Sequence, residues 1–330
     1  MSTPIDRPDG IPANGRSRPT PRIVVGVDGS AGARAGLVWA LGEAGRRGAD
    51  LEVLGAVPVD VYWADPYLVE SGRIDAFRAD TEARARAHVE DVRGDPATVG
   101  SSGVSVQVVV HAGPAAELLV EQAEGADLLV VGSRGRSGTR STLLGSVALH
   151  CSTHATCPVV VVHQSQPSTG EASKVVVGLE DSGMSRAALR AAVAEAARLG
   201  TEVEAVVAYQ RFDQWSELYT LAAPPVGETA EDARRRGKRI VAEVLGDVRA
   251  GSGPAVHVLA AEGPAGHVLV RRAEGAALLV VGSRSRNRLT GMVLGSVALH
   301  CVVHASVPVM VVRPETAVRR AVPLSTSARG

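Results

Sequence analysis

The most informative segment of this chain reads Ala126-Asp-Leu-Leu-Val-Val-Gly132-Ser-Arg-Gly135-Arg-Ser-Gly-Thr-Arg-Ser-Thr-Leu-Leu-Gly145-Ser146. It begins with a short apolar run typical of a buried strand, and residues 147–154 after it have the pattern of a short helix. A glycine-rich loop between a strand and a helix can bind phosphate, because backbone N–H groups point outward there and the helix dipole favours an anion. The glycine spacing matches neither the P-loop nor the dinucleotide pattern. The segment therefore predicts an anion-binding loop of a different type.

The residues around this loop alternate between strand and helix patterns. Strands are expected at residues 22–27, 51–57, 104–110, 128–131 and 158–162, with helices between them. The strands are continuous runs rich in Val and Leu, which is typical of parallel strands buried on both faces. Strands that alternate with helices in this way predict an α/β fold in which a doubly wound, five-stranded parallel sheet is flanked by helices.

The same pattern occurs a second time in the chain. Residues 174–178 repeat the first strand, and more than half of the positions in 111–163 are identical to those in 261–313. Such identity indicates a duplicated domain. We therefore expect the following organisation: a disordered N-terminus at 1–20, repeat 1 at 21–163, a polar linker at 164–173, repeat 2 at 174–313 and a disordered tail at 314–330.

Composition excludes several classes of partner. The formal net charge is zero and aromatic residues make up only 3% of the chain, which argues against a nucleic-acid surface or an anionic membrane as the partner. There is no signal-peptide pattern and no apolar run long enough to span a bilayer. Three cysteines in a chain of 330 residues fit a reducing compartment better than a disulfide scaffold. A soluble, cytoplasmic protein is expected.

The spacing Gly132-x2-Gly135-x9-Gly145-Ser146 resembles the nucleotide loop of ATP-binding universal stress proteins. The resemblance extends to Ile23-Val-Val-Gly26-Val-Asp28-Gly-Ser30, to Gly113-Pro114 and to His154-Ala-Thr-Cys157-Pro158, and it covers both repeats. The chain thus resembles a tandem universal stress protein of the actinobacterial type. This resemblance implies a flavodoxin-like sheet with strand order 3-2-1-4-5 in each repeat.

The resemblance also implies a bound adenine nucleotide: ATP, with AMP or ADP as alternatives, together with Mg²⁺. Asp28 would face the adenosine, main-chain groups near Val57 would meet the adenine, and the glycine loop would hold the ribose and phosphates. The candidate binding residues of repeat 1 are Gly26, Asp28, Val57, Gly113, Gly132, Ser133, Arg134, Gly135, Arg136, Ser137, Gly145 and Ser146. Glycines let the backbone come close to a phosphate, and arginines add charge-assisted donors. The alternative is that these glycines only shape a turn.

Repeat 2 departs from this motif at three positions. Ser285 stands where repeat 1 has Gly135, while Glu180 and Asp181 replace Asp28 and Gly29. A side chain at position 285 would be strained if the loop needs a left-handed backbone there, and an extra carboxylate would repel a polyphosphate. The candidate residues of repeat 2 are Gly178, Glu180, Gly282, Arg284, Gly295 and Ser296. We therefore expect the stronger ATP site in repeat 1.

The remaining clusters point to no catalytic or metal site. His150, Cys151, His154 and Cys157 lie close in sequence, but Val307 replaces Cys157 in the second copy, so buried packing is the preferred interpretation. No nucleophile elbow and no pair of acids occurs in both repeats. The basic run within 228–239 is expected to be an exposed helix face, not a nucleic-acid site.

The expected function is a nucleotide-dependent stress-response regulator that is not an enzyme. The alternative is a slow ATPase or a nucleotide-dependent transferase on the same fold, and a third hypothesis is an interaction scaffold that binds no nucleotide. The apolar strand at 158–162 lies at the sheet edge in the implied strand order and needs covering. Its copy at 308–312 could cover it in an intramolecular pseudo-dimer, and a homodimer is also compatible with the sequence.

Overall fold

A computed structural model describes residues 20–57, 71–135, 144–164, 174–210, 228–246, 253–283 and 294–313, without the side chains of 71–74. The chain divides into two compact units, residues 1–164 and 165–330. The segments predicted to be disordered, and the linker, lie outside the described residues, apart from Thr20 and Gln164. Each unit is described by itself below.

The described part of unit 1 contains a parallel β-sheet with helices on both faces. Its elements are β1 (Arg22–Val27), α1 (Ala31–Arg47), β2 (Asp50–Val57), α3 (Ser71–Arg93), the short 3-10 helix η2 (Pro96–Thr98), β3 (Val106–Ala112), α4 (Ala115–Gln122), β4 (Leu128–Gly132), α5 (Ser146–His154) and β5 (Val159–Val162). The strand order is β3-β2-β1-β4-β5, and the strands run parallel. The predicted doubly wound order 3-2-1-4-5 is confirmed.

Unit 2 repeats this architecture. Its described elements are β6 (Lys174–Gly178), α6 (Gly183–Leu199), β7 (Glu202–Tyr209), α7 (Ala230–Leu245), β8 (Val256–Glu262), α8 (Ala265–Arg272), β9 (Leu278–Gly282), α9 (Ser296–His304) and β10 (Val309–Val312). Its parallel strands follow the order β8-β7-β6-β9-β10, which is the order of unit 1 counted within the unit.

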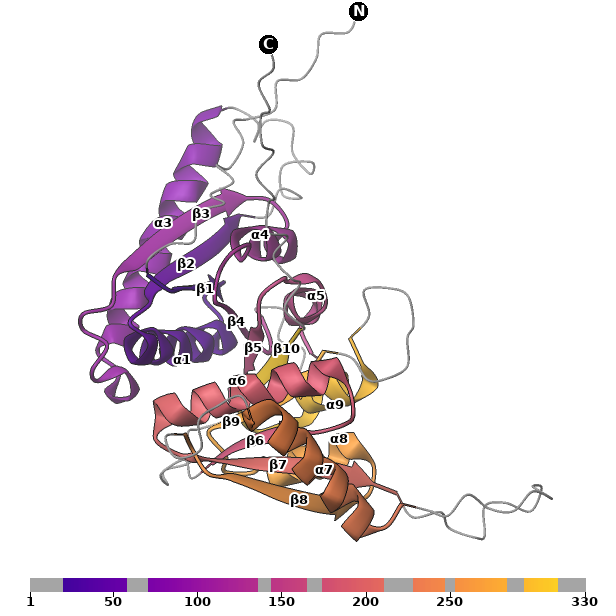
Figure 1. Cartoon of the computed structure of the whole chain (residues 1–330). Helices are drawn as coiled ribbons and strands as arrows, with labels where there is room; N and C mark the ends of the chain where they lie inside the picture. Colours follow the sequence, from indigo (N-terminus) through magenta and orange to yellow (C-terminus); the bar gives the residue numbers. More distant parts are fainter. Residues whose placement is uncertain are drawn as a thin grey trace, which may run out of the picture. The chain divides into compact units, whose positions relative to one another are not determined.

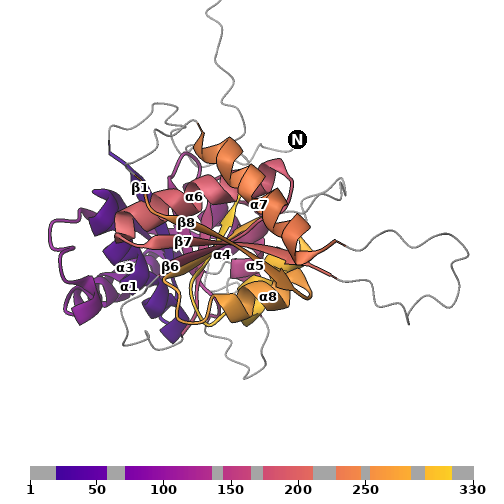
Figure 2. The same cartoon turned by 60° about the horizontal axis from the view of Figure 1, so that its bottom comes forward.

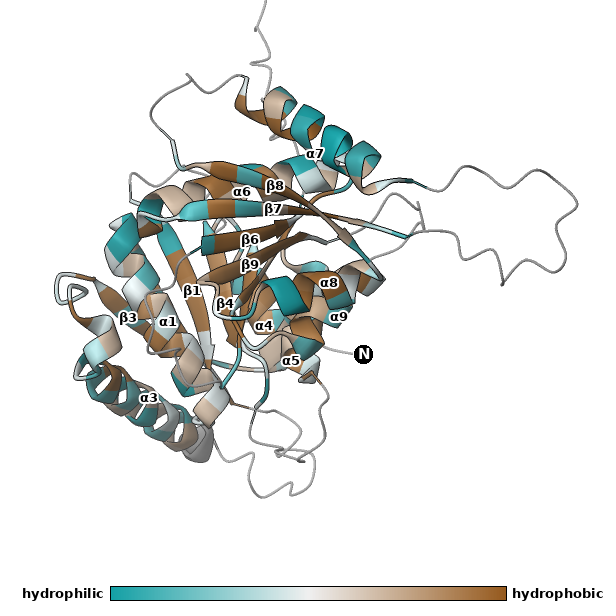
Figure 3. Cartoon of the chain, turned by 90° about the horizontal axis from the view of Figure 1, so that it is seen from below, coloured by the Kyte–Doolittle hydropathy of each residue, from teal (hydrophilic) through white to brown (hydrophobic). Residues whose placement is uncertain are grey.

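Two pairs of helices cover each sheet. In unit 1, α1 and α3 pack together on one face, and α4 and α5 pack together on the other (Figure 1). In unit 2, α6 and α7 lie on one side of β6, β7 and β8, and α8 lies on the opposite side (Figure 2). The strands between the helices are apolar, whereas α3 and α7 carry polar residues on their outer surfaces (Figure 3). Burial on both faces therefore explains the continuous Val and Leu runs of β4, β5, β9 and β10, whereas β3 and β8 are only partly buried.

The first helix of each unit has defined ends. Ser30 caps α1 by accepting a hydrogen bond from the Ala33 N–H, and Gly48 ends the helix in the left-handed conformation at φ 60°. Ser182 and Gly200 take the same places at the ends of α6. Serine side chains satisfy N-terminal N–H groups, and glycine tolerates the left-handed backbone. These caps fix where the loop that follows the first strand joins its helix.

Buried charges lie near the amino ends of the strands, away from the carboxyl ends. Glu52 of β2 pairs with Arg22 of β1 at 3.1 Å. At the equivalent place in unit 2, Glu204 pairs with Lys174 at 3.0 Å and with Arg272. Because these pairs compensate the charge of carboxylates at the amino ends of the strands, the carboxylates belong to this edge and not to the opposite one. Across the described residues, no helix has the length and apolar character needed to cross a bilayer.

Candidate functional site

The first half of the site in unit 1 is the turn between β1 and α1. The Asp28 carboxylate accepts a hydrogen bond from the Ser30 N–H at 2.9 Å, which closes a turn in which Gly29 adopts φ +81°. The Ser30 hydroxyl in turn accepts from the Ala33 N–H at 3.1 Å. The polar side chains therefore serve the turn and the helix cap, and they hold a carboxylate at the carboxyl end of the central strand.

The second half of the site is the loop after β4, which comes against this turn. A Cβ placed on Gly135 would lie 2.7 Å from Asp28 Oδ2, so the loop backbone directly contacts the carboxylate. Gly135 does not adopt a positive φ. The left-handed backbone considered for this loop position is therefore absent at Gly135, and a Cβ there would instead have to displace the Asp28 carboxylate. Ser285, its counterpart, lies outside the described residues.

The β4 loop is also tied to the start of α1. A Cβ on Gly132 would lie 2.5 Å from the carbonyl carbon and oxygen of Gly32, so the two backbones are in direct contact. The Ser30 hydroxyl donates a hydrogen bond of 3.4 Å to the carbonyl oxygen of Arg134. These contacts bring two segments about a hundred residues apart in sequence to the same edge of the sheet.

Backbone hydrogen bonds join the two ends of the loop. The Ser133 N–H donates to the Val162 carbonyl at 2.8 Å, and the Gly145 N–H donates to the Ser133 carbonyl at 2.9 Å. Gly145 is the N-cap of α5, and the exposed Ser146 is its first residue. The first turn of α5 therefore begins directly beside the end of β4, where its N–H groups and dipole can attract an anion.

The charged groups of the loop are only partly described. Arg134 is exposed at this edge, whereas Arg136 and Ser137 lie outside the described residues. One cation, one half-buried carboxylate at Asp28 and the start of a helix therefore converge in the described part of the site. This arrangement can bind an anion and a group that donates hydrogen bonds, such as a sugar hydroxyl.

Three other predicted residues have contacts within the fold. The Gly113 N–H donates to the Val57 carbonyl at 2.9 Å, which ties the turn before α4 to the end of β2. Gly113 adopts φ +150°, a conformation that favours glycine. A Cβ on Gly26 would lie 2.9 Å from Leu119 Cδ1, so this glycine lets α4 pack on the sheet. Val57 is thus placed at the strand ends, and Gly26 at the packing surface behind them.

At the corresponding strand ends of unit 2 there is a cavity of about 330 Å³. Four of the predicted residues line it: Gly178, Glu180, Gly282 and Gly295. The rest of its described lining comprises Leu179, Asp181, Ser185, Val206, Ala208, Glu228, Arg236, Ala265, Leu269, Val281, Val297 and Ala298. Ser296 is the first residue of α9, and Arg284 lies outside the described residues. The two ends of the loop are joined as in unit 1, because the Gly295 N–H donates to the Ser283 carbonyl at 2.8 Å.

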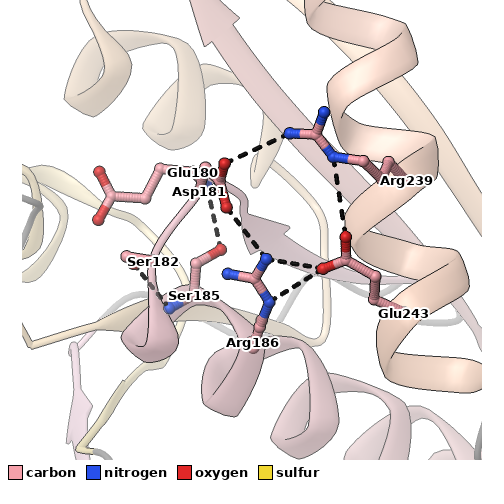
Figure 4. Close-up of polar contacts among 7 residues, drawn as sticks. All are labelled: Glu180, Asp181, Ser182, Ser185, Arg186, Arg239 and Glu243. Carbon is pink, nitrogen blue, oxygen red and sulfur yellow. Dashed lines mark hydrogen bonds and ion pairs between the residues drawn. The ribbon is translucent and has the colours of Figure 1, made fainter.

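The turn between β6 and α6 is built differently from its counterpart. The Glu180 N–H donates to the Ser185 hydroxyl at 2.9 Å, and the Ser185 N–H donates to the Ser182 hydroxyl at 3.1 Å (Figure 4). In repeat 1 an alanine, Ala33, takes the place of Ser185. The Ser182 N–H, whose counterpart in repeat 1 donates to the Asp28 carboxylate, donates in repeat 2 to the main-chain carbonyl of Glu180 at 2.9 Å, so no side-chain carboxylate accepts this turn hydrogen bond.

Asp181 belongs to a four-residue charge cluster with Arg186, Arg239 and Glu243. Its carboxylate lies 3.0 Å from the Arg186 guanidinium and 3.3 Å from that of Arg239, while Arg186 also contacts Glu243 at 2.7 Å (Figure 4). A hydrogen bond to Glu243 and, to a smaller extent, one to Asp181 raise the pKa of Arg186. The expected repulsion between Asp181 and a polyphosphate is therefore reduced, because two cations neutralise this carboxylate.

A further difference between the repeats was missed in the sequence. Gly32, which contacts the β4 loop in unit 1, is replaced by Met184 in the first turn of α6. Both residues stand two positions after the capping serine, so the substitution is visible in the sequence. The sequence does not show why this substitution matters, because only the fold shows that the β4 loop passes over this position.

The histidines and cysteines of this region lie in α5, α8 and α9, apart from Cys157, which follows α5. The rings of His150 and His154 stack with centroids 4.1 Å apart, and His300 contacts both His267 and His304 at 4.3 and 4.4 Å. Within the described ranges, no group of three or more His, Cys, Asp or Glu side chains could hold a metal ion. The cysteine thiols at 151, 157 and 301 are buried. These groups therefore belong to helix packing in the described structure.

Comparison with known proteins identifies the family. The model of the universal stress protein family matches residues 19–163 and again residues 171–313. The chain belongs to the universal stress protein family. The two matches correspond to the duplication inferred from the sequence, so this universal stress protein carries two family domains in tandem.

Similar proteins share this tandem organisation over nearly their whole length. A universal stress protein of Mycolicibacterium smegmatis is 33% identical over 299 residues, an alignment that covers 88% of this chain and 97% of the relative. A universal stress protein of Mycobacterium tuberculosis is 32% identical over 298 residues, which cover 88% and 96% of the two chains. The actinobacterial type expected from the sequence is therefore confirmed.

Solved structures agree with the fold. A universal stress protein from Archaeoglobus fulgidus superposes with a TM-score of 0.62 at 19% identity, covering 89% of this chain and 96% of that one. A functionally unknown protein from Pseudomonas aeruginosa gives a TM-score of 0.57 at 18% identity, with 90% and 94% covered. At these identities the likeness concerns the fold alone.

Proposed function

We propose that this universal stress protein is a nucleotide-dependent stress-response regulator whose main ATP site is in repeat 1. One observation supports this most directly: the Asp28 carboxylate, the glycine loop after β4 and the first turn of α5 meet at the carboxyl ends of β1 and β4. In open α/β sheets this edge is where ligands bind. Occupancy of the site, and not turnover, would change which partners the protein binds.

The residues fit the parts of an adenine nucleotide. Asp28 can accept hydrogen bonds from ribose hydroxyls, and its carboxylate oxygens are of the kind that Mg²⁺ prefers as ligands. Gly135 and Gly145 bring the backbone close to Asp28 and Ser133, respectively, so a Cβ would intrude on the cradle that a phosphate needs. The start of α5 and the exposed Arg134 supply the positive potential for the phosphates.

Repeat 2 differs in ways that disfavour the same ligand. Met184 replaces the glycine that contacts the loop, and the turn bond that the Asp28 carboxylate accepts in repeat 1 goes to the main-chain carbonyl of Glu180. The lining of its cavity includes Glu180, Asp181 and Glu228 but only one described cation, Arg236. Arg236 and Asp181 are both held by protein partners of opposite charge. We therefore place the weaker ATP site in repeat 2.

The experiment is to purify the full chain without added nucleotide, identify any retained nucleotide, and titrate ATP by calorimetry. We expect one tight site per chain and ATP that stays intact over hours. Gly145→Asp should abolish this site, because it adds a negative charge where α5 attracts an anion. Gly295→Asp makes the same change in repeat 2 and is the matched control, which should keep the tight site.

Three outcomes would contradict the proposal. Two equal sites would refute the preference for repeat 1, and steady ADP formation would favour the slow ATPase. Absence of binding would favour an interaction scaffold. The pairing of the two edge strands in a pseudo-dimer, a homodimer and the cytoplasmic location stay predictions from the sequence.

A further inference from the structure

Gly32 makes the closest approach between α1 and the β4 loop. A Cβ placed on it would lie 2.4 Å from the carbonyl oxygen of Arg134 and 3.3 Å from Gln164 Nε2. Real Cβ atoms essentially never come within 3.0 Å of a backbone atom. The opposing surface is also a glycine, because Gly132 lies against the Gly32 carbonyl. The loop can therefore follow its path only while position 32 has no side chain.

The position of this carbonyl affects the rest of the site. It accepts a hydrogen bond from the Ser30 hydroxyl, and the next residue, Gly135, lies against the Asp28 carboxylate. A displacement of Arg134 away from α1 would therefore separate the loop from both polar groups of the β1 turn. Because the same loop leads to the start of α5, the cradle for an anion would change while Asp28 itself stayed in place.

In repeat 2 the equivalent position carries a side chain. Met184 follows Ser182 by two residues, as Gly32 follows Ser30, and both serines cap their helices. Its Cβ lies 3.0 Å from where a Cβ on Gly282 would be, and its sulfur lies 3.9 Å from the Ser283 hydroxyl. A carbonyl placed as that of Arg134 is placed in repeat 1 would overlap the Met184 Cβ. Position 184 therefore leaves no room for a carbonyl at the place that the Arg134 carbonyl takes beside Gly32.

We propose that Gly32 is a positioning residue that determines ligand specificity: it gives repeat 1 its preference for phosphorylated nucleosides, and Met184 removes that preference from repeat 2. This inference rests on the proposed function, because it assumes that repeat 1 binds ATP. It adds the reason why the two repeats differ, which lies in the first turn of the helix and outside the glycine motif itself.

The first test compares Gly32→Ala with Gly42→Ala in the full chain. Both changes add one methyl group to α1, but a Cβ on Gly42 meets nothing nearer than 3.5 Å. Calorimetry should show that Gly32→Ala weakens ATP binding by about tenfold or more, as expected for loss of a charge-assisted hydrogen bond, and leaves adenosine affinity unchanged. Gly42→Ala should keep both affinities. A merely structural defect would weaken ATP and adenosine together.

The second test introduces the repeat 1 residues into repeat 2, and it decides the matter if Gly32→Ala fails to fold. One variant carries Glu180→Asp, Asp181→Gly, Ser185→Ala and Ser285→Gly, and a second carries these changes together with Met184→Gly. Only the second should bind an additional ATP. An additional ATP in both variants, or in neither, would overturn the role of Met184.

The two proposals fail in different ways. If the unmodified chain binds no ATP, the proposed function is wrong, and this inference falls with it. If the unmodified chain binds ATP and Gly32→Ala binds it equally well, or loses adenosine binding to the same degree, only the inference on Gly32 is wrong. Circular dichroism of each variant provides the check that the fold is retained.

Discussion

Individual glycines in this protein are required for different physical reasons. Gly29 and Gly113 adopt positive φ, so their backbone conformation favours glycine. Gly32 is needed because the Arg134 carbonyl lies where a Cβ would be, and a Cβ on Gly135 would have to displace the Asp28 carboxylate. The distinction matters for repeat 2, because Asp181 replaces Gly29 and no described residue other than glycine has a positive φ. The β6 turn therefore changed its conformation instead of accepting strain.

The three buried cysteines should be unreactive in the folded protein. Burial raises the pKa of the Cys151 thiol to about 12, and the neighbouring Cys157 adds to this shift. Burial also raises the pKa of Cys157 to about 11 and that of Cys301 to about 12. Since the thiolate is the reactive form, the folded protein should not react with a disulfide reagent at about pH 8, and all three thiols should react after unfolding.

A second measurement tests whether Cys157 serves only as a buried apolar residue. The variant is Cys157→Val, which introduces the residue found at the equivalent position of repeat 2. It should lower the free energy of unfolding by no more than about 1.5 kcal/mol, because it exchanges one buried apolar group for another of similar volume. Rapid labelling of any cysteine in the native protein would contradict the burial described here.

The sequence predicted the helices and strands whose formation depends on residues close to one another in the chain. The continuous apolar runs predicted the strands, and Arg46, Arg47 and Gly48 predicted the end of α1. Boundaries moved by a few residues; the third strand, for example, begins at Val106 and not at residue 104. The sequence could not predict the contact of Gly32 with Arg134 or that of Asp181 with Arg239, because these partners lie about a hundred and about sixty residues away. Such contacts depend on how helices pack over the strand ends.

The helix pairs α4–α5 and α8–α9 differ in charge, and this difference should affect the stability of the protein at low pH. Burial, then His304 and His267, lower the pKa of His300. In unit 1, burial and then His154 lower the pKa of His150, but Glu117 opposes this shift. An imidazole with a lowered pKa stays neutral in the folded state while the unfolded chain takes up the proton. Stability is therefore fully present above the unfolded pKa of 6.5 and is lost as pH falls through the lowered folded pKa.

The measurement is thermal unfolding of the full chain between about pH 7.5 and 5.5, the range in which histidine titrates. His267→Glu gives repeat 2 the acid of repeat 1 and should reduce the loss of stability at the acid end. Glu117→His is the matched exchange in repeat 1 and should increase that loss. If both variants have the pH profile of the unmodified protein, these histidines do not control its acid sensitivity.

In the whole molecule, the two copies share the fold but differ in the residues of the candidate site. Strand order, helix caps and the bond that closes the loop are the same in both units. The differences that bear on the site lie at the carboxyl edge of the strands, where Glu180, Asp181 and Met184 replace Asp28, Gly29 and Gly32. A fold tolerates such changes because ligand sites lie in the loops and not in the sheet core. Divergence of one copy can therefore alter binding without weakening the architecture.

Hydrogen exchange of the full chain with ATP can test this asymmetry directly. We expect ATP to slow exchange in peptides covering 22–34 and 128–149, because amides at the β1 turn and at the start of α5 would hydrogen-bond to ligand or be shielded by it. Peptides covering 174–186 and 278–299 should exchange equally with and without ATP. Adenosine should protect the first peptide of repeat 1 more than the second, since it has no phosphates for the glycine loop to hold. Equal protection of both repeats by ATP would show that the substitutions at the strand ends of repeat 2 do not weaken nucleotide binding.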